Sequence, residues 1–466
     1  MEHYKVIVIG GGPGGYETAI RLNQYEIPVA LIEKDRIGGV CLNRGCIPTK
    51  ALVKSVELIR EIRESSAYGL PAMEIEPDFA AIFERKNGIV ESLVGGIEHL
   101  FRKRKIPIIS AEATQIQKQE SGYRIQLSNG ESYTADYVVL ATGSRAKSLP
   151  GIEIDEVNIL SSTGLLELKE LPPSLAVVGG GVIGCEFASI FAALGAQVTI
   201  IEFLPRILAL EDEEIGKRMA LAFKKSGIKV LTKVGVSAIE AAGDMQKLIL
   251  TDESELTAHK VLISVGREPV MDIATKGFDL KRERGAVVID EIMRSSEKGI
   301  YAIGDLNAKL QLAHTASKQG LAVAAHILAQ ICGKDTPMKP MNYINIPRCT
   351  FTNPELASVG YTELQAKEIF GEIKIGKFPF SASGKAMAMS ATTGFVKTIA
   401  KKDTGEMVGM HIMGPQAAEL IAQGAIMISQ NLSARDIHDI VFAHPTLSEA
   451  IMESVEDLEQ LAIHKI

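Results

Sequence analysis

The sequence has 466 residues, of which 46% are hydrophobic and 23% charged, a composition typical of a globular protein with about three domains. Its formal net charge is −7 and it has no block of like charge, which argues against nucleic acid and anionic membrane as partners. Five scattered cysteines do not form a secreted disulfide framework, no apolar run could span a membrane, and the N-terminal residues begin a buried strand rather than a signal peptide, so we expect a cytoplasmic protein.

The chain opens with the pattern of a dinucleotide-binding βαβ unit. A β-branched strand over residues 4–9 leads into a glycine turn, a helix is predicted over 16–25, and a strand over 29–32 ends in an acid. In such a unit the glycines allow a tight turn, the helix N-terminus faces a pyrophosphate, and the acid accepts a hydrogen bond from a ribose hydroxyl. The residues that match these roles are Gly10, Gly12, Gly15 and Glu33. The alternative is a glycine-rich turn without a ligand.

Residues 38–50, GGVCLNRGCIPTK, have the spacing of a reversible dithiol. Cys41 and Cys46 could form a disulfide when oxidised and separate when reduced. A disulfide that closes so short a loop adds only about 2 kcal/mol to stability, so its use would be chemical. Lys50 follows Cys46 by four residues on a predicted helix, where its charge can favour a thiolate. The spacing alone leaves open that both cysteines are core residues.

This stretch closely resembles the redox-active segment of the flavin-dependent pyridine nucleotide disulfide oxidoreductases, and most of all that of the members that oxidise dihydrolipoamide. The resemblance implies that Cys41 exchanges with substrate sulfur and that Cys46 contacts the flavin. It also implies FAD and NAD as cofactors, two nucleotide-binding domains, and a dimerisation domain at the C-terminal end.

The next segments predict a long helix and then a small sheet. Apolar residues recur with helical period over 78–101, and with a period of two over 106–140, where residues 129–130, Asn-Gly, predict a hairpin turn within an antiparallel meander. By the resemblance, Thr142 and Gly143, which follow, approach the flavin nucleotide.

A second copy of the opening pattern follows, with the same spacing from first glycine to terminal acid. Its residues are Gly179, Gly181, Gly184 and Glu202, with a helix predicted to Leu194 and a strand over 197–201. A carboxylate at Glu202 accepts from the 2′-OH of NAD and repels the phosphate of NADP, so NAD is favoured. Arg206 is the nearby cation that argues otherwise, unless it is a surface residue. A second meander is predicted over 229–265, and Gly266 after it is assigned to the nucleotide.

The resemblance assigns two further acids near the flavin. Glu186, on the second glycine-turn helix, would pair with Lys50; the alternative is an exposed helical glutamate. Asp305 ends the segment 299–305, GIYAIGD, and would hydrogen-bond the ribityl chain; the alternative is a turn cap. A helix over 314–330 would face the flavin with its N-terminus.

From residue 341 no nucleotide motif occurs, and an α+β layer is predicted. Alternating strands cover 395–400 and 407–413, and helices cover 417–430, 433–440 and 447–461. By the resemblance this layer is the dimerisation domain.

His444 and Glu449 form the last candidate pair. An imidazole can take a proton from a thiol near neutral pH, and Glu449 could hold the imidazolium. Alternatively, residues 446–449 are a capping box in which Glu449 closes a helix N-terminus, and His444 is a surface residue. In the resembled family this histidine reaches the disulfide of the other subunit, so we expect a homodimer with shared sites.

We therefore predict an α/β protein in which two Rossmann-like domains with antiparallel meanders precede an α+β dimerisation domain. The predicted domains are an FAD domain (1–146), an NAD domain (147–266), a central domain completing the FAD site (267–340) and an interface domain (341–466). The predicted reaction is NAD-dependent oxidation of dihydrolipoamide carried by lipoyl domains of a 2-oxoacid dehydrogenase complex or the glycine cleavage system. The alternatives are a reductase resembling glutathione reductase and a flavoprotein subunit with incidental nicotinamide oxidation. Phe442 and Thr315 depart from the family pattern.

Overall fold

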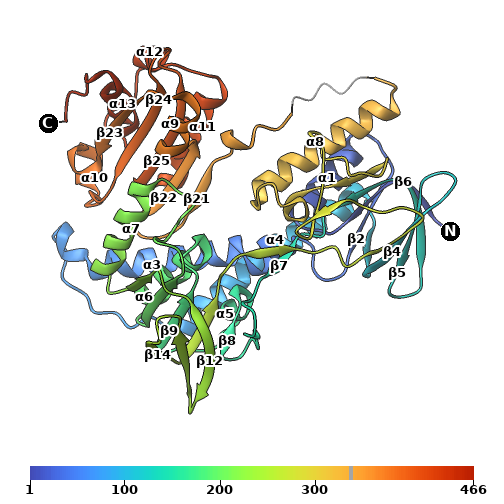
Figure 1. Ribbon diagram of the computed structural model, residues 1–466, viewed down its shortest axis with the longest axis horizontal. Coiled ribbons are helices and arrows are strands. Elements are labelled where there is room, and N and C mark those ends of the chain that lie inside the picture. The colour runs from blue at the N-terminus through green and yellow to red at the C-terminus, as the bar shows by residue number, and fades with distance from the viewer. Residues whose placement is uncertain (335–339, 466) are drawn as a thin grey trace. The chain divides into compact units, whose positions relative to one another are not determined.

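The computed structural model describes residues 1–334 and 340–465, and these form two compact units (Figure 1). The first unit comprises Met1–Ala51, Phe83–Lys147 and Gly266–Tyr343, and the second comprises Leu52–Ile82, Ser148–Val265 and Ile344–Ile466. The four predicted domains stay a prediction beside this division. Among the described residues, no helix has both the length and the apolar character needed to cross a membrane.

β1 (His3–Ile9) lies at the centre of the main sheet of the first unit. Its β-branched residues are almost wholly buried, as expected for a strand that is covered on both faces. β2 (Val29–Glu33) lies parallel on one side and β6 (Ser132–Leu140) on the other. The strand order is β17-β4-β5-β6-β1-β2-β3, with β20 paired to β6. The glycine turn after β1 therefore lies at the carboxyl edge of a parallel sheet, where such sheets bind ligands.

The meander predicted over residues 106–140 is only partly correct. β4 (Ala113–Lys118), β5 (Tyr123–Leu127) and β6 are antiparallel neighbours, and Gly130, at φ +84°, makes the predicted turn. β3 (Ile108–Ser110) instead runs parallel to β2, as the last strand of the Rossmann-like sheet. The other strands of this unit are β7 (Ser144–Ala146), β16 (Arg267–Pro269), β17 (Ala274–Lys276), β18 (Arg282–Glu283), β19 (Ala286–Val287) and β20 (Ile300–Ala302).

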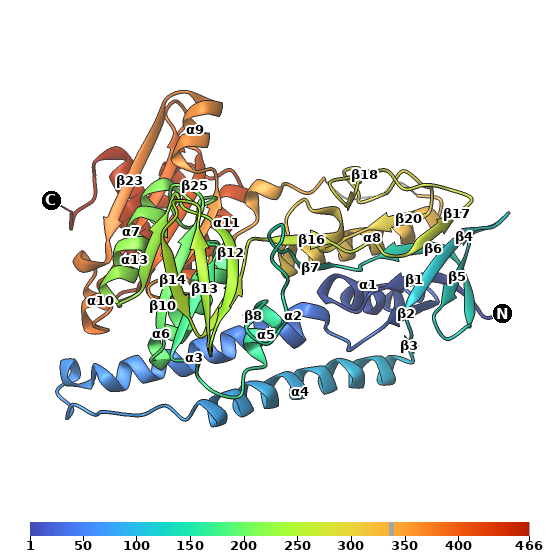
Figure 2. The same cartoon turned by 60° about the horizontal axis from the view of Figure 1, so that its bottom comes forward.

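The helices of the first unit confirm the predicted segments. α1 (Pro13–Gln24) packs closely against α8 (Ala313–Ile331). Gly14 allows this approach, since a Cβ at its position would lie only 3.0 Å from the backbone oxygen of Ala316. α4 (Phe79–Arg104) is the predicted long helix and is continuous in Figure 2. Its buried face is narrower than the apolar pattern predicted, since Leu93 and Leu100 are exposed.

The second unit repeats the βαβ pattern as predicted. β9 (Ser174–Val178), α6 (Val182–Leu194) and β10 (Gln197–Glu202) follow one another, and the parallel sheet has the order β11-β10-β9-β15-β8. The remaining elements here are β8 (Ile159–Leu160), α5 (Ser162–Leu166) and α7 (Glu213–Lys225).

The second predicted meander, residues 229–265, is correct only in its middle. β12 (Val236–Ala242), β13 (Met245–Leu250) and β14 (Glu255–Ala258) form a separate antiparallel sheet. The flanking strands join the parallel sheet instead: β11 (Lys229–Thr232) pairs with β10, and β15 (Lys260–Ile263) pairs with β9.

The last layer of the second unit is an antiparallel sheet with the order β21-β22-β25-β24-β23. α11 (Ala417–Ser429) and α13 (Glu449–Glu456) pack against strands of this sheet, as does α9 (Glu363–Phe370). The strands are β21 (Arg348–Thr350), β22 (Glu355–Gly360), β23 (Ile373–Pro379), β24 (Phe395–Lys401) and β25 (Met407–Gly414). The short helices of the chain are α10 (Gly384–Ala388), α12 (Ala434–His438), η1 (Ser65–Tyr68), η2 (Gly304–Asn307), η3 (Tyr343–Asn345), η4 (Phe380–Ala382) and η5 (Asp457–Glu459).

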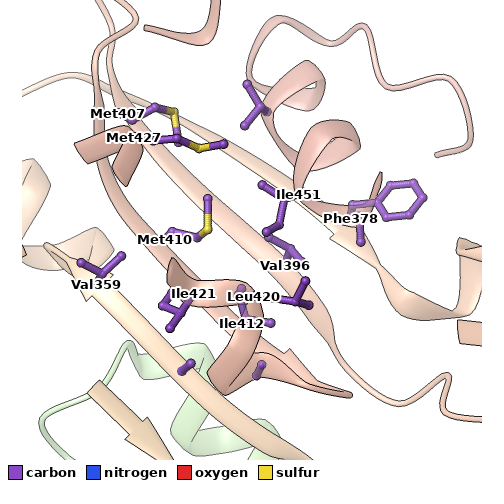
Figure 3. Packing of buried hydrophobic residues seen from close by; sticks show 14 of the residues in the cluster. Val359, Phe378, Val396, Met407, Met410, Ile412, Leu420, Ile421, Met427 and Ile451 are labelled. Carbon is purple, nitrogen blue, oxygen red and sulfur yellow. The ribbon is translucent and has the colours of Figure 1, made fainter. Parts of the chain in front are cut away.

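Three methionines lie in the core of this layer. Figure 3 shows Met407 and Met427 side by side, with Met410 near Ile412 and Ile421. Alternation of buried and exposed residues was predicted for the two central strands, but every residue of β25 is buried. The reason is that helices contact the sheet on both faces, with α9 residues packing on Ile399 and Val408 in a separate cluster.

A buried ion pair joins this layer to the start of α7. Lys397 Nζ on β24 lies 2.8 Å from Asp212 Oδ1 and 2.8 Å from Glu363 Oε2. The side chains of Lys397 and Asp212 are each 2% exposed. Burial acts to lower the pKa of Lys397, but its hydrogen bonds to both acids outweigh burial and raise it. Asp212 is also the N-cap of α7, since it accepts from the backbone N–H of Glu214 at 3.2 Å.

Replacing Lys397 with methionine should reduce the free energy of unfolding by about 3–5 kcal/mol, because it leaves Asp212 buried without its cation. Urea denaturation measures this change. The matched control is Lys367→Met, which removes an ion pair with the same Glu363 from a side chain that is 53% exposed. The control should lose less than about 1 kcal/mol. Equal losses in both variants would show that burial of the pair does not matter.

Candidate functional site

One short helix and the start of a longer one carry the predicted dithiol. α2 (Gly39–Arg44) carries Cys41, and α3 (Cys46–Arg63) begins with Cys46, after a break at Gly45. A side-chain hydrogen bond between the two thiols and then burial raise the pKa of Cys41, while the charge of Lys50 opposes the rise. The structure therefore brings together the two cysteines and the lysine that the sequence singled out.

The dithiol segment lies directly against the first glycine turn. Gly38 donates its backbone N–H to the oxygen of Gly11 at 2.8 Å. Gly39 has φ +58°, and a Cβ there would lie 2.6 Å from the Cα of Gly12. Only glycine permits this approach. A ligand bound at the turn would thus adjoin the segment that carries the cysteines.

The first glycine turn has the geometry of a nucleotide cradle. Gly10 has φ +106°, and a Cβ on Gly15 would lie 1.8 Å from the oxygen of Gly10, so neither tolerates a side chain. Around Gly12, by contrast, the nearest atom to a Cβ position lies 4.0 Å away. Glu33 Oε2 accepts the backbone N–H of Gly11 at 2.6 Å. Glu33 thus braces the turn, and its predicted contact with a ribose stays a prediction.

The second glycine turn repeats this geometry in the second unit. Gly179 has φ +106°, and a Cβ on Gly184 would lie 2.0 Å from the oxygen of Gly179. A Cβ on Gly181 would meet no described atom within 4 Å, so this glycine leaves open space for a phosphate. Glu202 Oε2 accepts the backbone N–H of Gly180 at 2.7 Å. The two acids therefore have equivalent places in the two turns.

Asp305 belongs to a polar cluster that the sequence did not reveal. Ser144 donates its hydroxyl to Asp305, and Arg267 Nε donates to the Ser144 hydroxyl at 2.7 Å. Burial lowers the pKa of Arg267, and the charges of Asp305 and Cys46 oppose this. Arg267 is therefore a cation within electrostatic reach of the dithiol. In the sequence, the only feature that could have pointed to Arg267 is its position directly after Gly266.

Thr142, Gly143 and Gly266 lie close to the points where the chain leaves the first unit and returns to it, and their hydrogen bonds join these two strands of chain. Thr142 donates its hydroxyl to the backbone oxygen of Val270, whose N–H donates to Gly143 at 3.0 Å. Gly266, at φ +116°, accepts the N–H of Lys147 at 3.1 Å. These contacts are structural, and the predicted nucleotide contacts of Thr142, Gly143 and Gly266 stay predictions.

Among the described residues of the first unit, buried polar side-chain atoms on α2 and on α8 lack a hydrogen-bond partner within the chain. Thr315 Oγ1, in the first turn of α8, and Asn43 Oδ1, on α2, are buried and have no hydrogen-bond partner among the described residues. Such atoms normally find a partner. Together with the open space at Gly12, they fit a polar ligand such as a flavin dinucleotide next to the dithiol.

Glu186 is buried, so its alternative as an exposed helical glutamate is wrong. Its Oε1 accepts the backbone N–H of Phe351 at 2.9 Å. Glu186 lies in the second unit and Lys50 in the first, and their pairing stays a prediction.

His444 and Glu449 meet as predicted. His444 Nδ1 lies 2.8 Å from Glu449 Oε1, and the imidazole is 79% exposed. Glu449 Oε2 also accepts the N–H of Thr446 at 2.8 Å, which is half of the capping box considered above. The box is incomplete, because α13 begins at Glu449 with Ser448 as its N-cap and no side-chain cap. With Nδ1 held, Nε2 is the nitrogen available to exchange a proton.

The candidate residues fall into two groups. The first unit holds Cys41, Cys46, Lys50, the first glycine turn and Asp305, and the second holds the second glycine turn, Glu186, Glu202, His444 and Glu449. The roles of all these residues stay predictions.

Family models and known proteins match the chain over nearly its whole length. A model described as pyridine nucleotide-disulphide oxidoreductase matches residues 4–320, and the dimerisation domain of the same group matches residues 346–455. The chain is 38% identical to dihydrolipoyl dehydrogenase of Chlamydia pneumoniae, over 97% of this chain and 96% of that protein. It is 36% identical to a dihydrolipoyl dehydrogenase of Bacillus subtilis, over 99% of both. The HOCl-induced flavoprotein disulfide reductase RclA from Escherichia coli has a similar structure, with a TM-score of 0.85, 28% identity, and coverage of 97% of this chain and 99% of that one.

Proposed function

The chain belongs to the pyridine nucleotide-disulphide oxidoreductase family, and on this basis we propose that it oxidises dihydrolipoamide through Cys41 and Cys46 with FAD and NAD as cofactors. The full-length relatives confirm the predicted family, fold class, enzyme class and cofactor pair. The observation that carries the assignment of the chemistry to these residues is the contact of Cys41 with Cys46 directly beside the first glycine turn.

Thiol–disulfide exchange accounts for the first half of the reaction. A thiolate of dihydrolipoamide attacks Cys41 in the Cys41–Cys46 disulfide and releases Cys46 as a thiolate. The second substrate sulfur then displaces Cys41, so that lipoamide leaves with a disulfide and the two cysteines hold the electron pair. The first glycine turn and Asp305 would hold FAD, which would supply the acceptor for this electron pair and the hydride that reduces NAD. Lys50 and Arg267 supply positive charge that favours thiolates at this site.

His444 takes the proton that dihydrolipoamide must lose before its sulfur can attack. Glu449 holds Nδ1, which directs Nε2 to the substrate and stabilises the imidazolium. The imidazole is 79% exposed on a layer that matches the family's dimerisation domain, which supports a homodimer in which each His444 serves the dithiol of the other subunit.

The second glycine turn favours NAD over NADP. Glu202 places a carboxylate at the position that meets the ribose 2′-OH. Arg206, the cation that could have bound a 2′-phosphate, donates instead to the backbone oxygens of Leu208 and Ala209 at 3.0 and 2.8 Å.

Replacing Glu202 with arginine should shift the ratio of kcat/KM for NAD to that for NADP by at least about a hundred-fold toward NADP, since a repulsive charge becomes an attractive one. The measurement is lipoamide-linked turnover with each cofactor. Glu202→Gln is the control, because it retains an oxygen that can accept the N–H of Gly180 or Leu204 but removes the charge, and it should fall between. An unchanged ratio in both variants would place Glu202 away from the ribose.

The substrate is tested by supplying purified, FAD-loaded protein with NADH and either lipoamide or glutathione disulfide. We expect lipoamide to be reduced faster, and faster reduction of glutathione disulfide would reject the assignment. The lipoyl group would arrive on lipoyl domains of a 2-oxoacid dehydrogenase complex or the glycine cleavage system, in the cytoplasm. Stimulation of turnover by such a domain over free lipoamide would support this partner.

A further inference from the structure

Gln319 lies on α8 and is wholly buried, although glutamine side chains are mostly exposed in proteins. A buried amide is costly unless its oxygen and its nitrogen both find partners. The amide of Gln319 hydrogen-bonds three residues of the first unit: Gly304, Asn307 and Tyr343. Two of these three belong to η2, the short helix that carries Asp305.

The amide of Gln319 holds η2 on both sides of Asp305. Its Oε1 accepts the backbone N–H of Gly304 at 2.6 Å and the side-chain amide of Asn307 at 3.0 Å. A backbone N–H can only donate, so the oxygen of the Gln319 amide must face η2. Its Nε2 therefore faces the other way and donates to the Tyr343 hydroxyl at 3.0 Å. Gln319 thus fixes the residue before Asp305 and the second residue after it.

Direct packing brings η2 against the same part of α8. Gly304 has φ +67°, and a Cβ at its position would lie 3.1 Å from the Cβ of Ala316, three residues before Gln319. Asn307 also donates to the backbone oxygen of Ala302, the last residue of β20, at 3.1 Å. η2 is therefore held between the end of β20 and one face of α8, and Gln319 bonds to it at two points.

This face of α8 also carries the hydroxyl of Thr315. Thr315 precedes Gln319 by four residues, so both side chains are on one side of the helix, and both are wholly buried. Thr315 Oγ1 has no hydrogen-bond partner among the described residues. The face that holds η2 therefore presents, one turn nearer the N-terminus of α8, a polar group that a bound dinucleotide could satisfy.

We infer that Gln319 is a positioning residue for the FAD site, which holds η2 so that Asp305 meets the cofactor in the required geometry. This inference rests on the proposed function, in which Asp305 helps to hold FAD. Ser144 bonds the carboxylate of Asp305, whereas Gln319 holds the backbone on either side of it. Because Gln319 Oε1 accepts two hydrogen bonds from η2, Gln319 acts through this turn.

Removing the amide should weaken FAD binding. Without Gln319 Oε1, the N–H of Gly304 and the amide of Asn307 lose a buried acceptor, and the turn relaxes until they find other partners. FAD binding must then restore the turn, so the cost appears as lost affinity. Gln319→Met, which keeps the length of the side chain but removes its polar atoms, should raise the Kd for FAD at least about ten-fold.

Serial dilution of the purified holoenzyme, with released FAD measured by its fluorescence, gives this Kd. Tyr343→Phe is the matched control, because it removes the third hydrogen bond of the same amide and leaves both bonds to η2. Its Kd for FAD should stay at the wild-type value. Asn307→Ala removes one of the two bonds between the amide and η2 and should give an intermediate Kd. This variant decides the question if Gln319→Met does not fold.

A double variant separates positioning of Asp305 from a purely structural role. Asp305→Ala should itself raise the Kd for FAD. Adding Gln319→Met to Asp305→Ala should then have little further effect on the Kd, because both substitutions remove the same contact with the cofactor. A structural role of Gln319 elsewhere in the fold would instead make the two effects add.

A raised Kd for FAD in Gln319→Met, with the wild-type value in Tyr343→Phe, supports the inference. An unchanged Kd in Gln319→Met and Asn307→Ala, an equal loss of affinity in Tyr343→Phe, or full additivity with Asp305→Ala overturns the inference alone. An unchanged Kd in Asp305→Ala overturns it together with the place of Asp305 in the proposed function. Variants that bind FAD as described, in a protein that does not turn over lipoamide, would reject the proposed function and leave the inference standing.

Discussion

Replacing Cys46 with serine is expected to lower lipoamide turnover by more than about a thousand-fold, because removing a group that forms the covalent intermediate costs most of an enzyme's rate. Cys41→Ser should be equally inactive, since a single thiol cannot close the disulfide. The two variants should differ in absorbance, because only Cys41→Ser keeps the thiolate assigned to contact the flavin. Steady-state kinetics and the long-wavelength absorbance on partial reduction measure both effects.

Cys332→Ser provides the control for the loss of a thiol as such. Cys332 is exposed at the end of α8 and has no assigned role, so this variant should keep wild-type turnover. If Cys41→Ser and Cys46→Ser both retained disulfide reduction, the contact between the two sulfurs would be structural and the proposed chemistry wrong.

Inactive subunits should complement each other when Cys46→Ser chains are mixed with His444→Gln chains. If each site combines the dithiol of one subunit with the imidazole of the other, a hybrid dimer contains one site with both wild-type groups. Random exchange makes about half of the dimers hybrid, so about one quarter of wild-type activity should return. Turnover after subunit exchange measures the recovery.

The control for this experiment is each variant mixed with itself, which should stay inactive. Heterodimers that form, as shown by differently tagged chains, but recover no activity would place His444 in the site of its own subunit or outside catalysis.

The sequence predicted local features well because short-range patterns carry them. The glycine turns, the acids that follow them and the Cys41–Cys46 spacing are set by backbone geometry within a few residues, and the structure places each as expected. The helical period of apolar residues predicted the length of α4. The same period did not predict that Leu93 is exposed, because exposure depends on which other elements pack against the helix.

Predictions failed where contacts between residues that are distant in sequence determine the structure. A period of two marks a strand but not the direction of its neighbour, so β3, β11 and β15 were assigned to antiparallel meanders although they join parallel sheets. Ser144 and Arg267 are far apart in sequence and meet only because β7 pairs with β16. No local sequence pattern predicts the cluster of Ser144, Arg267 and Asp305, or the contact between His464 and Glu453.

The buried methionines of the last layer can report chemically on whether the layer opens. Met407, Met410 and Met427 are buried, whereas Met387 of the same layer is exposed. A peroxide reagent oxidises a thioether only where it can reach the sulfur, and the sulfoxide is too polar for a packed core. Mass spectrometry of peptides from oxidised protein would therefore separate surface modification at Met387 from opening of the layer, methionine by methionine. The same chemistry makes any lasting exposure of this core self-reinforcing, because each sulfoxide opposes repacking.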